Sequence, residues 1–424
     1  MITLVLAGVL FTLIAIDVPI AVALGMAATI TIFTFTDLPS LVVAQKLFTS
    51  IDKFALMAIP FFVLAGSFLS EGGTAKRIIH FAHTMVGHLP GGLTMTAILA
   101  CAIFAAVSGS SPATVAAIGS IMIPAIKKAG YSDTFSIGSI TTSGALGILI
   151  PPSIVLIVYG VTVNQSIGDL FLAGIIPGIL ITAMLMTLTY VMAKRAGFTK
   201  GKPAPVKEKL KAFVDSFWAL MLVVIIIGGI YSGIFTPTEA AAVSAVYAFI
   251  VAKFIYNDVT WAEVPKIILT SAATSAMILF IIANAMLFAY FLTIQQIPQY
   301  LADLIISAHV SKFLFLAAVN VLLIIFGAFM EPSSIVMVTA PLLFPVAVHL
   351  GVDPIQLGII YTINMGVGMV TPPVGLNLFV ASGITGKSIQ YVTKVSLPWF
   401  FTYLAGLLLA TYVPALSTII FKIL

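Results

Sequence analysis

The segment from residue 93 to 129 constrains the fold most strongly, and its centre reads AAVSGSSPATVAA (105–117). Two apolar limbs flank the sequence Ser-Gly-Ser-Ser-Pro at 108–112. Each limb has about 16 residues and would be about 24 Å long as a helix, whereas a membrane-spanning helix needs about 20 residues. Glycine interrupts helices, and proline is favoured where a helix begins. The segment is therefore predicted to form a re-entrant helical hairpin.

The composition indicates a membrane protein. The chain has 424 residues, of which 61% are hydrophobic and 8% are charged, with a mean hydropathy of +1.20. Soluble domains carry about 25% charged residues, so lipid must solvate most of this surface. We expect an all-α protein with roughly ten to twelve helical crossings and some shorter pieces. Strands of a membrane β-barrel would show alternating hydrophobicity instead.

A second copy of the hairpin occupies about residues 312–350, with the sequence Gly-Ala-Phe-Met-Glu-Pro at 327–332. Landmarks on its C-terminal side recur at one offset of 221 residues (345 − 124), including Ile-Pro against Phe-Pro and two Pro-Pro pairs. Each Pro-Pro pair interrupts a further apolar segment, so each copy is predicted to contain a broken helix as well. These broken helices span about 134–163 and 355–384.

The repeat divides the chain into two halves, residues 1–192 and 214–424, joined by a basic linker at 193–213. The linker region holds seven of the nineteen lysines and arginines, namely Lys194, Arg195, Lys200, Lys202, Lys207, Lys209 and Lys211. The positive-inside rule places it in the cytoplasm. An odd number of crossings in each half gives inverted repeats with both termini in the periplasm, and an even number gives parallel repeats. Inverted repeats, which are common in secondary transporters, are the preferred interpretation.

The Pro-Pro pairs predict two pseudo-equivalent cation sites. Proline has no N–H, so Pro151 should leave the carbonyl of Gly147 without its helical partner, and Pro372 should do the same for Gly368. An unpaired carbonyl in hydrocarbon costs several kcal/mol, and unwound carbonyls in transporters coordinate sodium. A kink satisfied by neighbouring helices or water is the alternative. The hydroxyls near these breaks belong to Ser108, Ser110 and Thr371.

Each hairpin tip should aim the N-terminus of its second limb into the membrane, with Ser111 or Glu331 as the cap. That end of a helix dipole favours an anion. Glu331 could contact a polar substrate group or balance a cation, and an N-cap at a water-filled cavity is an equally good interpretation. The segment at 74–89 is amphipathic and should lie along the membrane interface. No motif for ATP-driven transport or for enzyme catalysis is present.

Four segments, at 107–119, 147–153, 233–242 and 369–379, carry a family resemblance. They read VSGSSPATVAAIG, GILIPPS, GIFTPTEAAA and MVTPPVGLNLF. In combination they resemble the large membrane subunit of tripartite ATP-independent periplasmic (TRAP) transporters over essentially the whole chain. The resemblance implies an elevator-type fold like that of the ion transporter superfamily and sodium-coupled uptake across the bacterial inner membrane. It also implies two partners, a small four-helix membrane subunit and a periplasmic substrate-binding protein.

The resemblance also implies particular site residues. One sodium site would use Ser108, Ser110, Gly147, Ile150 and Pro151, and the other would use Gly327, Gly368, Thr371 and Val374. The substrate would lie near Ser110, Ser153 and Glu331. The segments at about 40–52 and 74–89 would be connecting arms.

Family substrates are organic acids, and the chain looks most similar to the sialic-acid (N-acetylneuraminate) branch. Its only arginines, Arg77 and Arg195, lie outside the hairpin tips, which favours a monocarboxylate over a dicarboxylate. The alternatives are a TRAP subunit for C4-dicarboxylates and a self-sufficient sodium/C4-dicarboxylate symporter. A channel or a structural membrane subunit is a further class, against which the paired broken helices argue.

Overall fold

A computed structural model describes residues 2–16, 18–71, 73–198 and 200–423, and every regular element in those ranges is a helix. The all-α prediction is therefore confirmed. Seven helices in the described ranges are long and apolar enough to cross a membrane. Further apolar helices of 10–17 residues accompany them, so the ten to twelve crossings stay a prediction. Several other apolar helices, such as Gly92–Ser108 and Lys312–Gly327, end at glycine or serine breaks before they reach a full span.

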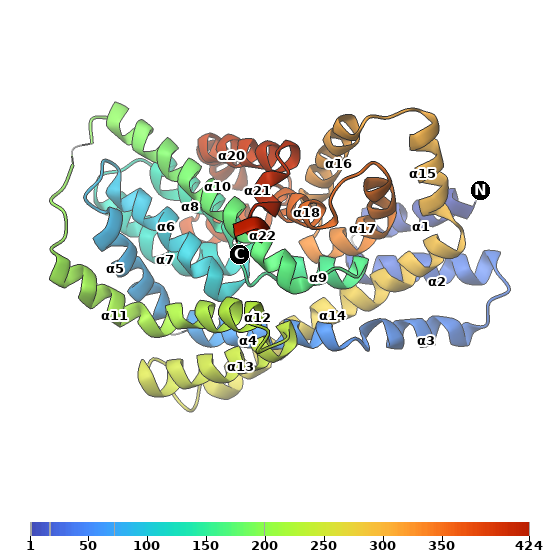
Figure 1. The fold of residues 1–424 in the computed structure, drawn as a ribbon, viewed down its shortest axis with the longest axis horizontal. Coiled ribbons are helices and arrows are strands. Elements are labelled where there is room, and N and C mark those ends of the chain that lie inside the picture. The colour runs from blue at the N-terminus through green and yellow to red at the C-terminus, as the bar shows by residue number, and fades with distance from the viewer. Residues whose placement is uncertain (1, 17, 72, 199, 424) are drawn as a thin grey trace.

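The described residues of the first half form ten α-helices, the last of which has 29 residues. Figure 1 shows how these helices are arranged. They are α1 (Ile2–Ala15), α2 (Ile20–Phe35), α3 (Ser40–Ile51), α4 (Ala58–Glu71), α5 (Thr74–Val86), α6 (Gly92–Ser108), α7 (Ser111–Lys128), α8 (Ser139–Ser143), α9 (Ile154–Val163) and α10 (Ile167–Arg195). A π-helical turn (Thr134–Gly138) precedes α8 and a 3-10 turn (Gly144–Ile148) follows it.

The second half also contains a hairpin, a broken helix and a long helix in that order, and it ends in two short helices. Its helices are α11 (Val206–Val223), α12 (Gly229–Tyr231), α13 (Pro237–Ile250), α14 (Val264–Ile294), α15 (Ile297–Ser307), α16 (Lys312–Gly327), α17 (Pro332–His349), α18 (Pro354–Gly368), α19 (Leu376–Thr385), α20 (Ile389–Tyr412), α21 (Ala415–Thr418) and α22 (Ile420–Ile423). The pairs α6–α7 and α16–α17 are the two hairpins, and α8–α9 and α18–α19 are the two broken helices.

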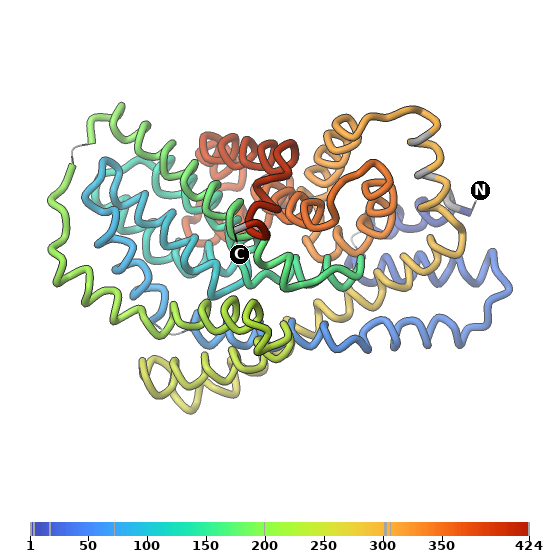
Figure 2. Tube along the Cα trace, viewed as in Figure 1, coloured from blue at the N-terminus to red at the C-terminus, as the bar shows by residue number. Residues whose placement is uncertain are grey.

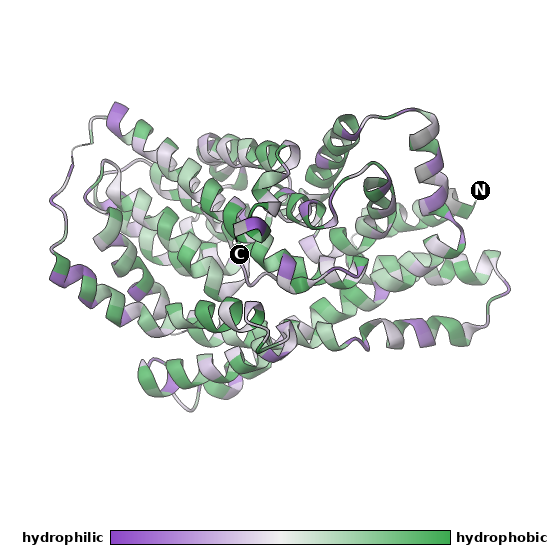
Figure 3. Cartoon of the chain, in the orientation of Figure 1, coloured by the Kyte–Doolittle hydropathy of each residue, from purple (hydrophilic) through white to green (hydrophobic). Residues whose placement is uncertain are grey.

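The connection between the halves is shorter than the linker predicted at 193–213. Helix α10 continues to Arg195 and α11 begins at Val206, so Lys207, Lys209 and Lys211 lie on a helix; residue 199 is outside the described residues. Pro205 directly precedes α11, where its missing N–H removes no helical bond. Hydrophilic residues gather at the end of α10 and the start of α11, whereas most other helices are hydrophobic along their length (Figure 3).

The two halves interlock at the centre of the molecule. Helix α9 of the first half packs against α17 of the second, and α19 of the second half packs against α7 of the first. The trace shows the green segment of α9 running to the orange segment of α17 (Figure 2). The buried rings of Tyr159 and Tyr361 lie 5.6 Å apart and join α9 to α18. The hairpins and broken helices therefore form one packed unit.

A second group of helices borders this unit. The long helix α14 packs against α2, α3 and α4, and α4 packs against α13. Helix α5, the predicted amphipathic segment, lies between α6 and α11 and buries Ile78 and Ala82 while Lys76 and His80 stay exposed. An ion pair between Arg77 and Asp258 holds the start of α5 to the connection between α13 and α14.

Candidate functional site

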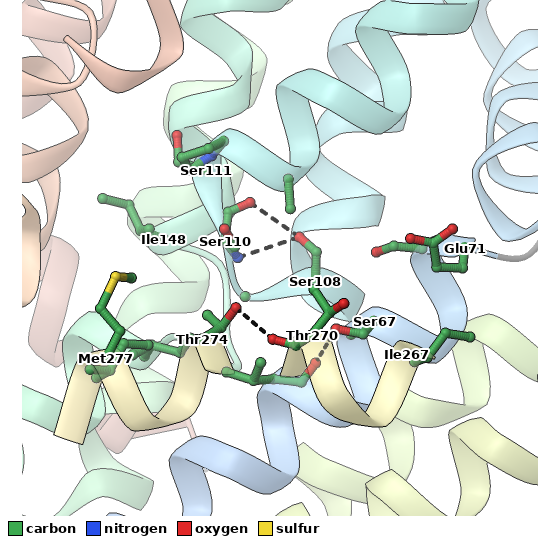
Figure 4. A pocket seen from close by; sticks show the side chains of 18 of the residues that line it. Ser67, Glu71, Ser108, Ser110, Ser111, Ile148, Ile267, Thr270, Thr274 and Met277 are labelled. Carbon is green, nitrogen blue, oxygen red and sulfur yellow. Dashed lines mark hydrogen bonds between the residues drawn. The ribbon is translucent and has the colours of Figure 1, made fainter. Parts of the chain in front are cut away.

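The tip of the first hairpin is a tight turn rich in hydroxyl groups. Helix α6 ends at Ser108, the next residue Gly109 has a φ of +60° that favours glycine, and α7 begins at Ser111. The hydroxyls of Ser108 and Thr114 lie 2.9 Å apart, and Thr114 donates to the carbonyl of Ser110 at 2.8 Å. Ser108 also donates to that carbonyl at 3.3 Å (Figure 4). Oxygen atoms are thus concentrated at this tip.

Ser110, and not Ser111, occupies the N-cap position of α7, so the prediction of Ser111 as the cap is wrong. The side chain of Ser110 makes no capping hydrogen bond. The Ser111 hydroxyl instead points away from Thr270 and Thr274 (Figure 4) and donates to the side chain of Asn377 at 2.9 Å. Ser111 lies one residue inside the helix, where its side chain no longer projects back over the first turn.

The tip of the first hairpin packs, through backbone atoms, against the interruption of the first broken helix at residues 147–153, called the first break below; the corresponding interruption at 368–375 is the second break. A Cβ on Gly147 would lie 2.5 Å from the Ser110 carbonyl oxygen, and one on Gly109 would lie 2.8 Å from that of Pro152. The structure therefore brings Ser108, Ser110 and Gly147 together. The side chains of Ile150 and Pro151 line a separate apolar cavity of about 640 Å³ between α6, α10 and α11, so only their backbone oxygens could serve a cation.

The second tip repeats this backbone packing. A Cβ on Gly327 would lie 2.8 Å from the Cα of Gly368, and the N–H of Val374 donates to the carbonyl of Ala328 at 3.0 Å. Pro372 has no N–H to donate to the carbonyl of Gly368, as predicted, but this carbonyl accepts a 2.9 Å hydrogen bond from the N–H of Thr371 and is therefore not unpaired. The last turn of α18 tightens to an i→i+3 bond, a common way of satisfying carbonyls at a helix end.

Both hairpin tips border one cavity of about 450 Å³, which is completed by α4 and α14. Figure 4 shows the side of this cavity where the first tip faces residues of α4 and α14. The predicted substrate residues Ser110 and Glu331 line it together. Ser153 does not; it is fully buried as the N-cap of α9, and its hydroxyl donates to the carbonyl of Ile148. Polar residues from the neighbouring helices also line the cavity: Ser67, Ser70, Glu71, Glu263, Lys266, Thr270 and Thr274.

The two tips differ in charge at the cavity. Glu331 caps α17, because its carboxylate accepts hydrogen bonds from the hydroxyl of Ser333 at 2.9 Å and from the N–H of Ser334 at 3.1 Å. A carboxylate at this position complements the positive end of the helix dipole. The N-terminus of α7 has a neutral serine there. An anion is therefore accommodated better at the first tip than at the second.

Sequence reasoning missed several of these residues. Lys266, Thr270 and Thr274 recur every fourth position, which places them along one face of α14, and that face borders the cavity. Polar residues at this spacing in an apolar helix were the available signal. Thr114 lies one turn after Ser110 and shares its helix face. Asn377 lies in the family motif at 369–379, but nothing in the sequence indicated its role in joining the two halves.

An all-helical membrane protein with two helical hairpins and two broken helices, whose hairpin tips border one cavity with several polar side chains in its lining, has the architecture of a secondary transporter. The family model described as "Tripartite ATP-independent periplasmic transporter, DctM component" matches residues 7–416. The chain belongs to this family of TRAP large permease subunits. It is a transport protein and not an enzyme.

Named relatives refine the comparison. The chain is 51% identical to a C4-dicarboxylate TRAP transporter large permease protein of Rhodobacter capsulatus, covering 98% of this chain and 97% of that protein. It is 48% identical to a protein of the same description from Pseudomonas aeruginosa, covering 93% and 92%. It is 36% identical to a sialic acid TRAP transporter permease protein of Haemophilus influenzae, covering 89% and 61%. The predicted greater likeness to the sialic-acid branch is therefore not supported.

Among solved structures, the YdaH transporter of Alcanivorax borkumensis has a similar fold. The TM-score is 0.59 at 13% sequence identity, and the match covers 87% of this chain and 86% of that chain. At this identity the likeness concerns the fold alone.

Proposed function

We propose that this chain is the translocating subunit of a sodium-driven system that takes up a C4-dicarboxylate across the inner membrane of a bacterium. It would act with a small four-helix membrane subunit and a periplasmic substrate-binding protein, with the linker in the cytoplasm and both termini in the periplasm. The cavity between the two hairpin tips is the observation that carries this proposal. Family membership and the names of the most similar relatives support it.

The lining of the cavity suits an anion with two carboxylates. One carboxylate would bind at the uncapped N-terminus of α7 beside Ser110, and the other would bind Lys266 on α14. Lys266 supplies a positive charge in the cavity lining, so the lack of arginines at the hairpin tips does not by itself favour a monocarboxylate. The cavity also holds four acidic side chains, those of Glu71, Asp258, Glu263 and Glu331, of which Asp258 is paired with Arg77. Bound cations would offset their repulsion of a dicarboxylate.

Sodium would occupy the two places where a hairpin tip meets a break. Sodium is a hard cation, and hard cations take oxygen ligands. The first place offers the hydroxyls of Ser108 and Thr114 and the carbonyl of Ser110. The second brings the backbone of Gly327 close to that of Gly368, one turn from the hydroxyl of Thr371. No cofactor besides sodium is needed for this function.

An elevator motion fits the way the helices pack. The hairpins and broken helices interlock as one unit, and the cavity lies between their tips and helices α4 and α14, which themselves pack against α6 and α17 of that unit. A substrate bound at the tips would travel with the unit while α4 and α14 remain fixed. This arrangement also distinguishes the proposed mechanism from that of a channel, in which no packed unit needs to move.

The test is uptake of labelled succinate or sialic acid into proteoliposomes that contain this chain and its small subunit. Each substrate is measured with and without its binding protein, under an inward sodium gradient or an equal potassium gradient. We expect succinate uptake that needs both sodium and the binding protein. Sialic acid uptake would replace the proposed substrate, and uptake without a binding protein would indicate a self-sufficient symporter. Equal rates in sodium and potassium would contradict sodium coupling.

A further inference from the structure

Asn377 links the two hairpin systems through its side chain. It is the second residue of α19, is fully buried, and accepts a 2.9 Å hydrogen bond from the hydroxyl of Ser111. Its amide nitrogen donates to the carbonyl of Thr141 in α8 at 3.1 Å. Asn377 therefore joins the second broken helix to both the hairpin and the broken helix of the first half.

The backbone of Asn377 extends this link to the second hairpin. Its N–H donates to the carbonyl of Met369, the first residue after α18, at 3.1 Å. The same break continues to Val374, whose N–H bonds to Ala328 in the second hairpin tip. The second tip is thus connected to Ser111 at the first tip by the hydrogen bonds of Val374 and Asn377 and by the short stretch of backbone between these two residues.

The link has no counterpart at the equivalent position of the other repeat. At the repeat offset, the position equivalent to Asn377 is Leu156 (377 − 221), which can form no side-chain hydrogen bond. An asparagine buried inside a membrane protein loses its hydrogen bonds to water, so it is retained at low cost only when its partners are fixed. Here the amide oxygen and the amide nitrogen each have a partner from a different element of the first half.

We propose that Asn377 is a positioning residue that makes sodium binding at the two hairpins cooperative, an inference that rests on the sodium-coupled function proposed above. Sodium at the second tip orders the break from 369 to 375. The hydrogen bonds of Asn377 then hold the first tip in the geometry that binds the other sodium ion. Coupling of this kind is reciprocal, so occupancy of the first site favours the second equally.

The experiment measures the sodium dependence of uptake in proteoliposomes of the complete complex with its binding protein, using the substrate found to be transported. For the wild type we expect a Hill coefficient clearly above 1. For Asn377→Leu we expect a coefficient close to 1 and a half-saturating sodium concentration at least about fivefold higher, the lower end of typical coupling. The substrate KM at saturating sodium should change little, which a general loss of structure would not produce.

Ser111→Ala tests the same link with a smaller change, because it removes one hydroxyl and keeps the helix. It should lower the Hill coefficient in the same direction, and adding it to Asn377→Leu should have no further effect. Asn284→Ala is the matched control. This amide in α14 is also buried, but it donates only to Phe280 of its own helix and lies outside the cavity lining.

The outcomes separate the two proposals. If wild-type uptake does not respond to sodium, the proposed function fails. If wild-type uptake needs sodium but has a Hill coefficient of 1, the inference about Asn377 is overturned. It is also overturned if Ser111→Ala and Asn377→Leu keep the wild-type coefficient, or if Asn284→Ala lowers it equally.

Discussion

Replacing Gly327 or Gly368 with alanine should weaken sodium binding at the second hairpin. The added Cβ would lie 2.8 Å from the Cα of Gly368 in the first case and 2.5 Å from the Cα of Gly327 in the second. Carbon atoms at rest are separated by about 3.5–4.0 Å, so the two backbones must move apart by roughly 1 Å. Both atoms that clash belong to helix backbones, and neither can rotate out of the way.

The size of the effect follows from the cost of overpacking. Inserting a methyl group into a packed interior costs about 1–3 kcal/mol, and about 1.4 kcal/mol corresponds to a tenfold change in an equilibrium constant. If the whole of this cost falls on sodium binding, because the ligands are held by the close approach of α16 and α18, the half-saturating sodium concentration should rise about 5- to 150-fold. The better helix propensity of alanine, about 1 kcal/mol, acts in the opposite direction on stability alone.

The assay is sodium-dependent uptake, together with thermal unfolding of the purified protein at several sodium concentrations. Gly383→Ala is the control, because Gly383 lies in α19 and a Cβ there would meet nothing within 4 Å. It should gain stability without a change in sodium dependence. Unchanged half-saturation in both Gly327→Ala and Gly368→Ala would refute the assignment of the second sodium site to this contact.

Three further substitutions test the site. Thr114→Val removes the hydroxyl next to Ser108 and should raise the half-saturating sodium concentration for uptake about tenfold at unchanged protein yield. Thr114→Ser keeps a hydroxyl and should have a half-saturating concentration close to that of the wild type. Equal behaviour of the two variants would exclude Thr114 as a sodium ligand. Glu331→Ala removes the cap of α17 and should lower the free energy of unfolding by about 0.5–2 kcal/mol, while Glu331→Asp should lose less, as measured by thermal unfolding. Lys266→Gln should raise the KM for a C4-dicarboxylate about tenfold, the equivalent of about 1.4 kcal/mol, and Lys266→Arg should raise it less; an unchanged KM would remove Lys266 from the substrate site.

The positions of the breaks could be predicted because local chemistry determines them. The turn between α6 and α7 falls at Gly109 and Ser110, inside the predicted Ser-Gly-Ser-Ser-Pro tip. The second tip begins after Gly327. Glu331 caps the helix that follows, as predicted. Glycine, proline and capping residues act over one helical turn, so a single sequence is sufficient to locate them.

Contacts between distant elements could not be predicted in the same way. The face of α14 that carries Lys266 and Thr270 is defined by the sequence, but its position opposite the hairpin tips depends on tertiary packing. The hydrogen bond that replaces the lost partner of the Gly368 carbonyl could not be predicted either. Proline removes one i→i+4 bond, and a helix end can replace it with a tighter i→i+3 bond that sequence alone does not reveal.

The asymmetry of the two tips bears on how one substrate can be bound between two similar halves. Two equal tips would each attract an anion with the positive end of a helix, and a carboxylate would have no preferred partner. In this chain Glu331 occupies that end of α17 with its own carboxylate, while Ser110 leaves the end of α7 neutral and exposed to the cavity. An anionic substrate should therefore bind with one carboxylate fixed at the first hairpin. Its remaining part should lie toward α14, where Lys266 and the threonines of the cavity face it, so the side chains of α14 should discriminate between substrates of different length and charge.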